Sequence, residues 1–181
     1  MGDGMKIAKL GCASGMVLAA STGQALAAET PASAVFDPTT IVAKGRISTY
    51  RHGTYPSEGD LTHAGIDIAA PCASSTVLAW QGGTVADVVS SVDDPNFDSL
   101  GYMVLIDHGT IKQAGKRTYS LYLHLNEPPR DANGNPLLKD GKVERGKKIG
   151  VVGATGAAQG CHLHFELRHF AGRFNPVWKN I

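Results

Sequence analysis

Starting at His162, the chain reads His-Leu-His-Phe-Glu-Leu, a stretch in which polar and apolar residues alternate. Apolar side chains at every second position are typical of a β-strand with one buried face, so Leu163, Phe165 and Leu167 are expected to point into a core. His162 and His164 then project from the opposite face, with Cα atoms about 7 Å apart. The stretch therefore predicts a strand that presents two imidazoles side by side.

A segment about forty residues earlier has the same design. In Leu-Tyr-Leu-His-Leu, we expect Leu121, Leu123 and Leu125 to form the apolar row of a strand. His124 is then expected to face away from that row, as the histidines of the first stretch do.

A third segment begins at His63 and reads His-Ala-Gly-Ile-Asp-Ile. Its pattern predicts that Ile66 and Ile68 are buried and that Asp67 projects from the other face. The small Ala64-Gly65 pair allows the chain to bend so that His63 joins Asp67.

The rest of the chain also favours strands. From about Gly45 onward, short apolar runs alternate with turn residues, and no stretch has a clear helical period. Residues 153–160 form a Gly/Ala loop, and 131–140 form a turn-rich insertion. We therefore expect a mostly β, sandwich-like single domain of antiparallel sheets. The further predicted strands are 66–68, 75–80, 83–89, 102–106, 118–123 and 148–152.

Composition excludes several classes of protein. The chain has 181 residues, of which 43% are hydrophobic and 18% charged, which suits one folded domain rather than a disordered chain. The 17 Lys and Arg residues balance 16 Asp and Glu, so a nucleic-acid partner held through its phosphates has no support. No apolar run is long enough for a stable membrane span.

The N-terminus is predicted to be a secretory targeting segment. Lys6 and Lys9 precede a short apolar stretch, and the small residues around Ala27 resemble a signal-peptidase site. We therefore expect residues 1–27 to be a signal peptide and 28–44 a linker or arm, with export to the periplasm or the extracellular space. The alternatives are a lipoprotein anchored at Cys12 and a disordered cytosolic leader.

Cleavage after Ala27 would leave two of the three cysteines, Cys72 and Cys161. An even pair in an exported protein suggests a disulfide, and the alternative is two buried free thiols.

Histidine and aspartate together suggest a metal. Zn²⁺ binds imidazole and carboxylate, and a catalytic zinc site has three protein ligands with one position open to water. Any one of these histidines is more often a surface or hydrogen-bonded residue than a ligand. A His/Asp/His set from distant segments, with two further histidines nearby, is nevertheless the composition that a hydrolytic zinc site needs.

These segments resemble a known family. His63-x-x-x-Asp67, Tyr122-Leu-His-Leu125 and Gly160-Cys-His-Leu-His-Phe-Glu166 are similar to the three motifs of the LytM/lysostaphin-like zinc metallopeptidases, peptidase family M23. The order of the intervening segments also matches, and the resemblance covers about Gly45 to Pro176.

The resemblance implies a lysostaphin-type peptidase fold over residues 45–181 and a zinc endopeptidase that cuts the stem or cross-link peptides of bacterial peptidoglycan. It implies that His63, Asp67 and His164 bind Zn²⁺ and that His124 and His162 form the catalytic pair. We expect the protein to act as a monomer.

The chain also departs from the family pattern. Cys161 stands where proline is frequent, and in such a fold it would lie close to Cys72, so the resemblance implies a Cys72–Cys161 bridge that braces the site. The insertion from Asn126 to Val143 is longer than is typical, which puts any borrowed substrate preference in doubt.

Two other functions compete with an active endopeptidase. A non-catalytic wall-binding or amidase-activating module usually lacks one or more ligands, and this chain lacks none. A wall hydrolase with a Cys72 or Cys161 nucleophile needs a free thiolate, which a disulfide excludes. Of the remaining histidines, we expect His108 to serve a turn and His169 to be exposed. His52 precedes the first motif and is a candidate for lining the substrate groove.

Overall fold

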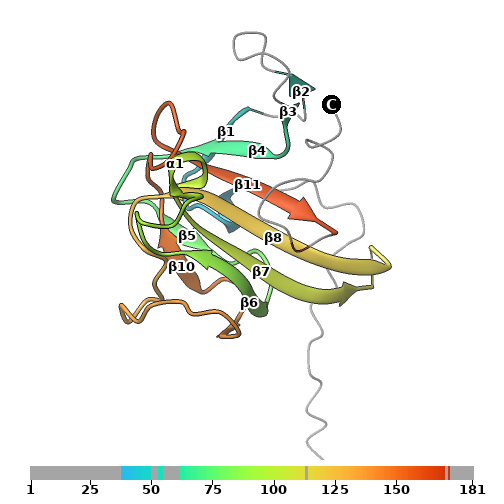
Figure 1. Ribbon diagram of the computed structural model, residues 1–181. Helices are drawn as coiled ribbons and strands as arrows, with labels where there is room; N and C mark the ends of the chain where they lie inside the picture. The colour runs from blue at the N-terminus through green and yellow to red at the C-terminus, as the bar shows by residue number, and fades with distance from the viewer. Residues whose placement is uncertain (1–37, 50–52, 55–61, 113, 170, 172–181) are drawn as a thin grey trace, which may run out of the picture. The chain divides into compact units, whose positions relative to one another are not determined.

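The computed structural model describes residues 38–49, 53–54, 62–112, 114–169 and 171 (Figure 1). The predicted signal peptide and His52 lie outside the described residues. The described residues all belong to one compact unit, Ala32–Ile181. Among the described residues, no helical segment has the length and hydrophobicity that a transmembrane span requires.

Antiparallel strands make up nearly all of the regular structure, which confirms the predicted fold class. The largest sheet has seven strands in the order β1-β4-β11-β8-β7-β6-β9, and β10-β5 and β2-β3 form two-stranded sheets. The elements are the 3₁₀ helix Pro38–Thr40, β1 Arg46–Thr49, β2 Gly53–Thr54, β3 Thr62–His63, β4 Ile66–Ala69, β5 Thr76–Leu78, β6 Gly83–Val89, α1 Phe97–Leu100, β7 Tyr102–Ile111, β8 Lys116–Leu125, β9 Lys142–Val143, β10 Lys148–Val151 and β11 His162–Arg168.

The main core lies between the large sheet and the β5–β10 ribbon. Ile68, Leu163 and Phe165 point into it as predicted, and Val77 and Ile149 of the ribbon cover them. Near the end of the predicted arm, residues 41–42 are also part of this core and are fully buried. Covering this face leaves the opposite face of the sheet available for polar groups.

The opposite face carries a second apolar cluster over β6, β7 and β8. Met103, Leu105, Leu121 and Leu123 form its floor, and Phe97 of α1 packs against it. Helix α1 was not predicted, because a single turn of four residues is too short to show a helical period.

The predicted single row of leucines in β8 is wrong. Leu121 and Leu123 lie in the second cluster, whereas Leu125 lies in the main core. The cause is a bulge, because β7 pairs with Tyr122 and then with Leu125, so that Leu123 and His124 together oppose one residue of β7. His124 has a φ of 62°, and the alternation of faces shifts by one residue at this point. His124 therefore lies on the same side of the sheet as Leu123.

Leu167 also differs from its prediction, because 47% of its surface is exposed. Strand β11 makes its last pair with β4 at Phe165, and the main core ends with that residue. Alternation in the sequence cannot show where the covering layer stops.

A chain of buried and half-buried polar groups runs beside the main core. His108 donates its Nδ1–H to the carbonyl of Gly82 at 2.9 Å, and its Nε2 lies 2.7 Å from the Ser120 hydroxyl. That hydroxyl is hydrogen-bonded to the Tyr122 hydroxyl at 3.0 Å, which also accepts the backbone N–H of Trp80 at 2.8 Å. His108 lies within β7 and not in a turn, so that prediction is wrong; its ring links Gly82, just before β6, to Ser120 of β8. Although Ser120 and His108 are paired like a nucleophile and its base, Ser120 is fully buried and its role is structural.

The Tyr122→Phe substitution tests this chain. It removes the hydroxyl but leaves the Trp80 N–H and the Ser120 hydroxyl buried without that partner, which is expected to lower the free energy of unfolding by about 1–3 kcal/mol. Urea denaturation measures the change. The control is Tyr102→Phe, because Tyr102 is only half-buried and bonds to Thr155 through its backbone N–H, which the substitution keeps. Equal stability losses in the two variants would contradict the structural role of the chain.

Candidate metal centre and catalytic histidines

Three side chains meet at one point on the face of the sheet opposite the main core. They are His63 at the end of β3, Asp67 of β4 and His164 of β11, each less than 10% exposed. His63 Nε2, Asp67 Oδ1 and His164 Nδ1 lie 3.0 Å from one another in each pair. Among the described residues, they form the one group of His, Cys, Asp and Glu side chains arranged to hold a metal ion.

Strand pairing and one glycine produce this convergence. Asp67 and His164 are direct partners in the antiparallel pair of β4 with β11, so their side chains share one face. The turn between His63 and Asp67 passes against β11, where a Cβ at Gly65 would lie 2.3 Å from the carbonyl oxygen of Phe165. Only glycine permits this approach, which brings His63 over the end of the pair.

The charges in this cluster are those that a cation requires. Burial raises the pKa of Asp67, but hydrogen bonds with His164 and His63 outweigh it and hold the pKa well below its ordinary value. Asp67 is therefore ionised at neutral pH. Four-coordinate zinc with ligands at about 2.0–2.1 Å places its ligand atoms about 3.4 Å apart, close to the spacing seen here. The residues therefore fit a tetrahedral metal ion.

A buried ion pair supports His164 from behind. The Nε2–H of His164 donates to Glu166 Oε1 at 2.9 Å, and Arg168 donates its Nε–H to Glu166 Oε2 at 2.6 Å. Burial raises the pKa of Glu166, but its bonds with His164 and Arg168 outweigh it and lower the pKa to about 2. A proton held on Nε2 leaves the Nδ1 lone pair of His164 directed at Asp67 and His63, as a metal ligand requires.

The role of Glu166 and Arg168 was missed in the sequence. The signal was available, because His164, Glu166 and Arg168 alternate along one strand and must share a face. An acid and a base at such spacing are also common on solvated strands. Only their burial, with 4% and 6% exposure, shows that these two belong to the centre.

Two further imidazoles stand beside the cluster. The ring centroid of His124 lies 5.0 Å from that of His162 and 6.1 Å from that of His164. His162 Nε2 is 3.7 Å from Asp67 Oδ1. Burial, and then the nearby His162 and His164, lower the pKa of His124 to about 4, so His124 is neutral at pH 7. The structure therefore brings all five predicted site residues together, although their roles remain predictions.

One loop orients both of these imidazoles. His124 donates its Nδ1–H to the carbonyl of Thr155 at 2.8 Å, and His162 donates its Nδ1–H to the carbonyl of Gly160 at 2.9 Å. Both acceptors belong to the Gly/Ala loop 153–160. In each ring, the proton on Nδ1 leaves Nε2 as the acceptor nitrogen. Thr155 was not identified from the sequence, because a backbone acceptor leaves no residue-type signal.

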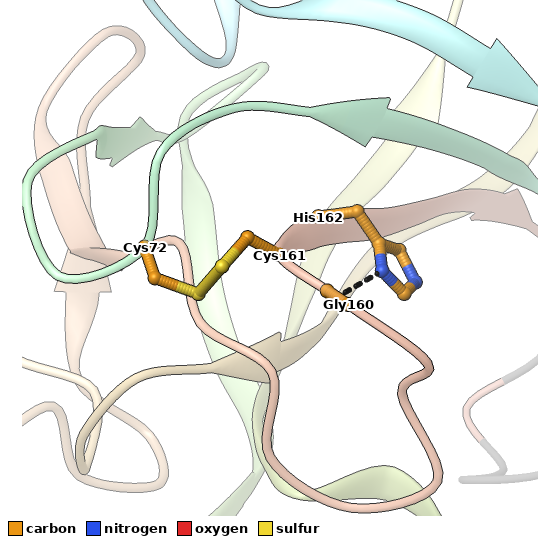
Figure 2. Close-up of a disulfide and its surroundings, with 4 residues drawn as sticks. All are labelled: Cys72, Gly160, Cys161 and His162. Carbon is orange, nitrogen blue, oxygen red and sulfur yellow. Dashed lines mark hydrogen bonds between the residues drawn. A yellow bond between two sulfur atoms is a disulfide. The ribbon is translucent and has the colours of Figure 1, made fainter.

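The remaining candidates lie elsewhere. His169 is exposed, as predicted, and donates a hydrogen bond to the carbonyl of Arg117. Cys72 and Cys161 form the predicted disulfide (Figure 2). Neither sulfur is then available as a thiolate nucleophile, so the disulfide contradicts the thiol-hydrolase alternative.

Comparison with known proteins agrees with this geometry. The family model of peptidase family M23 matches residues 61–176. The chain is 35% identical over 121 residues to peptidoglycan DD-endopeptidase ShyA of Vibrio cholerae, which covers 66% of this chain and 23% of that protein. It is 31% identical over 106 residues to peptidoglycan DD-endopeptidase ShyB of the same organism, which covers 58% and 20%. The matched part thus spans less than a quarter of these relatives.

A solved structure gives the same result for the fold. The catalytic domain of EnpA, a prophage-encoded M23 protein from Enterococcus faecalis crystallised in a mutant form, is 28% identical to this chain. The two structures superpose with a TM-score of 0.51, over 70% of this chain and 82% of that domain. With the motifs, the fold and the family model in agreement, we conclude that the chain belongs to peptidase family M23.

Proposed function

We propose that the protein is a zinc metalloendopeptidase that hydrolyses peptide bonds in the stem or cross-link peptides of bacterial peptidoglycan. The observation that carries the proposal is the geometry of the site, in which three buried ligand atoms converge beside two imidazoles with acceptor nitrogens. The curated relatives ShyA and ShyB, named as peptidoglycan DD-endopeptidases, support the substrate class.

Zinc suits the donor set of His63, Asp67 and His164, and bound at these residues it supplies Lewis acidity and a water of lowered pKa. Asp67 contributes the one negative charge among the three ligands. Glu166 keeps the proton of His164 on Nε2, so that Nδ1 remains a ligand.

His124 and His162 are placed to handle protons at the scissile peptide. Each presents an Nε2 acceptor that takes a proton from water and returns it to the leaving amine. When protonated, either imidazole also donates to the carbonyl oxygen on which negative charge develops. We assign one histidine to each task.

Export is part of the same proposal. A disulfide persists in an oxidising compartment and is rare in the cytosol, so the Cys72–Cys161 bond supports an exported protein. Peptidoglycan peptides are found in the same compartments.

The metal requirement is the first test. Removal of zinc by a chelator is expected to stop peptide release from purified peptidoglycan, and one equivalent of zinc is expected to restore it. The Asp67→Ala variant should neither bind zinc stoichiometrically nor recover activity, because it lacks the anionic ligand. Mass spectrometry of the released muropeptides measures the activity and identifies the bond. Undiminished hydrolysis by the metal-free protein would refute the proposal.

The second test separates catalysis from metal binding. The His124→Ala variant is expected to bind zinc like the wild type, but to hydrolyse peptidoglycan at least about a hundredfold more slowly, because a proton-transfer group is lost. His169→Ala is the matched control, since that exposed imidazole lies away from the site. Hydrolysis at the wild-type rate by His124→Ala would remove this residue from the mechanism. A wild-type protein that binds zinc and wall but cuts nothing would favour the non-catalytic module.

The third test concerns the support of His164. Glu166→Gln keeps an acceptor near Nε2 but removes the charge, and zinc affinity is expected to fall about 10- to 100-fold. Competition with a chromophoric chelator measures the dissociation constant, and near-UV circular dichroism checks the fold. Glu144→Gln serves as control because its side chain is 81% exposed. Equal zinc affinity in the two variants would show that Glu166 does not tune the ligand.

A further inference from the structure

The disulfide lies directly beside one of the two histidines of the site (Figure 2). Cys161 immediately precedes His162 on β11, and its partner Cys72 follows shortly after β4, the strand of Asp67. Their Cα atoms are 5.2 Å apart. The bond thus ties the end of the Gly/Ala loop to the segment that follows the ligand strand.

Strand pairing positions the backbone of His162 without the disulfide. His162 is the partner of Ala69 in the β4–β11 pair, and its N–H donates to the carbonyl of Gly153 at 3.2 Å. The direction of its ring depends on a different contact, the bond from Nδ1–H to the carbonyl of Gly160. The orientation of the ring therefore depends on how firmly the Gly160 carbonyl is held in place.

Packing gives Gly160 little support. The residue is exposed, and a Cβ added to it would meet no atom within 4 Å. Its neighbour Cys161 is exposed as well. Figure 2 shows the dashed hydrogen bond between the His162 ring and Gly160 next to the covalent bond that joins Cys161 to Cys72.

The acceptor of the other histidine is held differently. The Thr155 hydroxyl donates to the carbonyl of Leu125 at 2.6 Å and accepts the N–H of Tyr102 at 3.1 Å. The next residue, Gly156, has a φ of 72° and packs so closely that a Cβ there would lie 2.3 Å from the nitrogen of Gly101. The orientation of His124 is therefore independent of the disulfide.

We propose that the Cys72–Cys161 disulfide is a positioning element for His162. It holds the Gly160 carbonyl where it accepts the Nδ1–H of the ring, and so keeps the Nε2 acceptor of His162 directed at the metal centre. The three ligands and His124 keep their places without it. This inference rests on the proposed function for its catalytic consequence, but its structural content stands apart from any activity.

The test compares the zinc-loaded full chain with its Cys72→Ala/Cys161→Ala double variant. Long-range ¹H–¹⁵N spectra of the imidazoles report which nitrogen carries the proton. In the wild type, His162 and His124 should both be protonated on Nδ1. In the double variant, His162 is expected to average between its two tautomers, whereas His124 and the affinity for zinc stay unchanged.

Kinetics give the second readout. The double variant is expected to lose about 10- to 100-fold in kcat with little change in KM, because a misplaced proton-transfer group slows the chemical step. In a His162→Ala background, loss of the disulfide should cause no further decrease. The matched control is Thr155→Val, which removes the hydroxyl that holds the acceptor of His124. In this variant His124 is expected to lose its fixed orientation, whereas His162 should keep its proton on Nδ1.

Reduction of the folded wild type repeats the test without a substitution. A phosphine reductant converts the disulfide to two thiols, while water supplies the two protons and the oxygen of the phosphine oxide. The change at His162 should reverse on reoxidation.

Three outcomes would overturn the inference: an unaltered His162 tautomer, an equal loss of kcat in the His162→Ala background, or global unfolding on reduction. If the oxidised wild type cuts no peptidoglycan, the proposed function fails, whereas the spectra and the zinc titration still decide the role of the disulfide.

Discussion

The pairing of β4 with β11 is the contact on which the rest of the site depends. It makes Asp67 and His164 direct cross-strand neighbours on one face, and it places Ile68 and Leu163 on the other. The apolar face is buried under the β5–β10 ribbon, so a shift of one strand by one residue would turn its polar side chain into the core and separate Asp67 from His164. The burial that holds the sheet together therefore also fixes the positions of these two side chains of the candidate metal centre.

The centre concentrates buried polar groups that are costly unless they are paired. Asp67, His164 and Glu166 are each less than 10% exposed, and each has hydrogen-bond partners. A cation at the three ligand atoms would balance the carboxylate and occupy the space toward which the lone pairs point. The positive charge of Arg168 likewise balances the carboxylate of Glu166, which supports His164.

The orientation of His124 and His162 depends on backbone carbonyls as much as on side chains. The left-handed conformation of His124, which is unusual for a residue with a Cβ, accompanies a bulge that turns the ring toward the centre. The loop 153–160 then supplies the acceptors for the Nδ1–H groups of both His124 and His162. Two different restraints hold this loop, hydrogen bonds at Thr155 and a covalent bond at Cys161.

The sequence alone was enough to predict the antiparallel strands and the polar face of β11, because the two-residue period of Leu163 and Phe165 follows directly from strand geometry. The sequence motifs also predict His63, Asp67 and His164 as one set. The sequence could not show that Leu125 changes faces, because the bulge is defined by what lies opposite on β7. Nor could it distinguish Glu166 from a solvated charge. Burial, register and backbone acceptors are relations between segments that are distant in the sequence, so they become visible only in the folded chain.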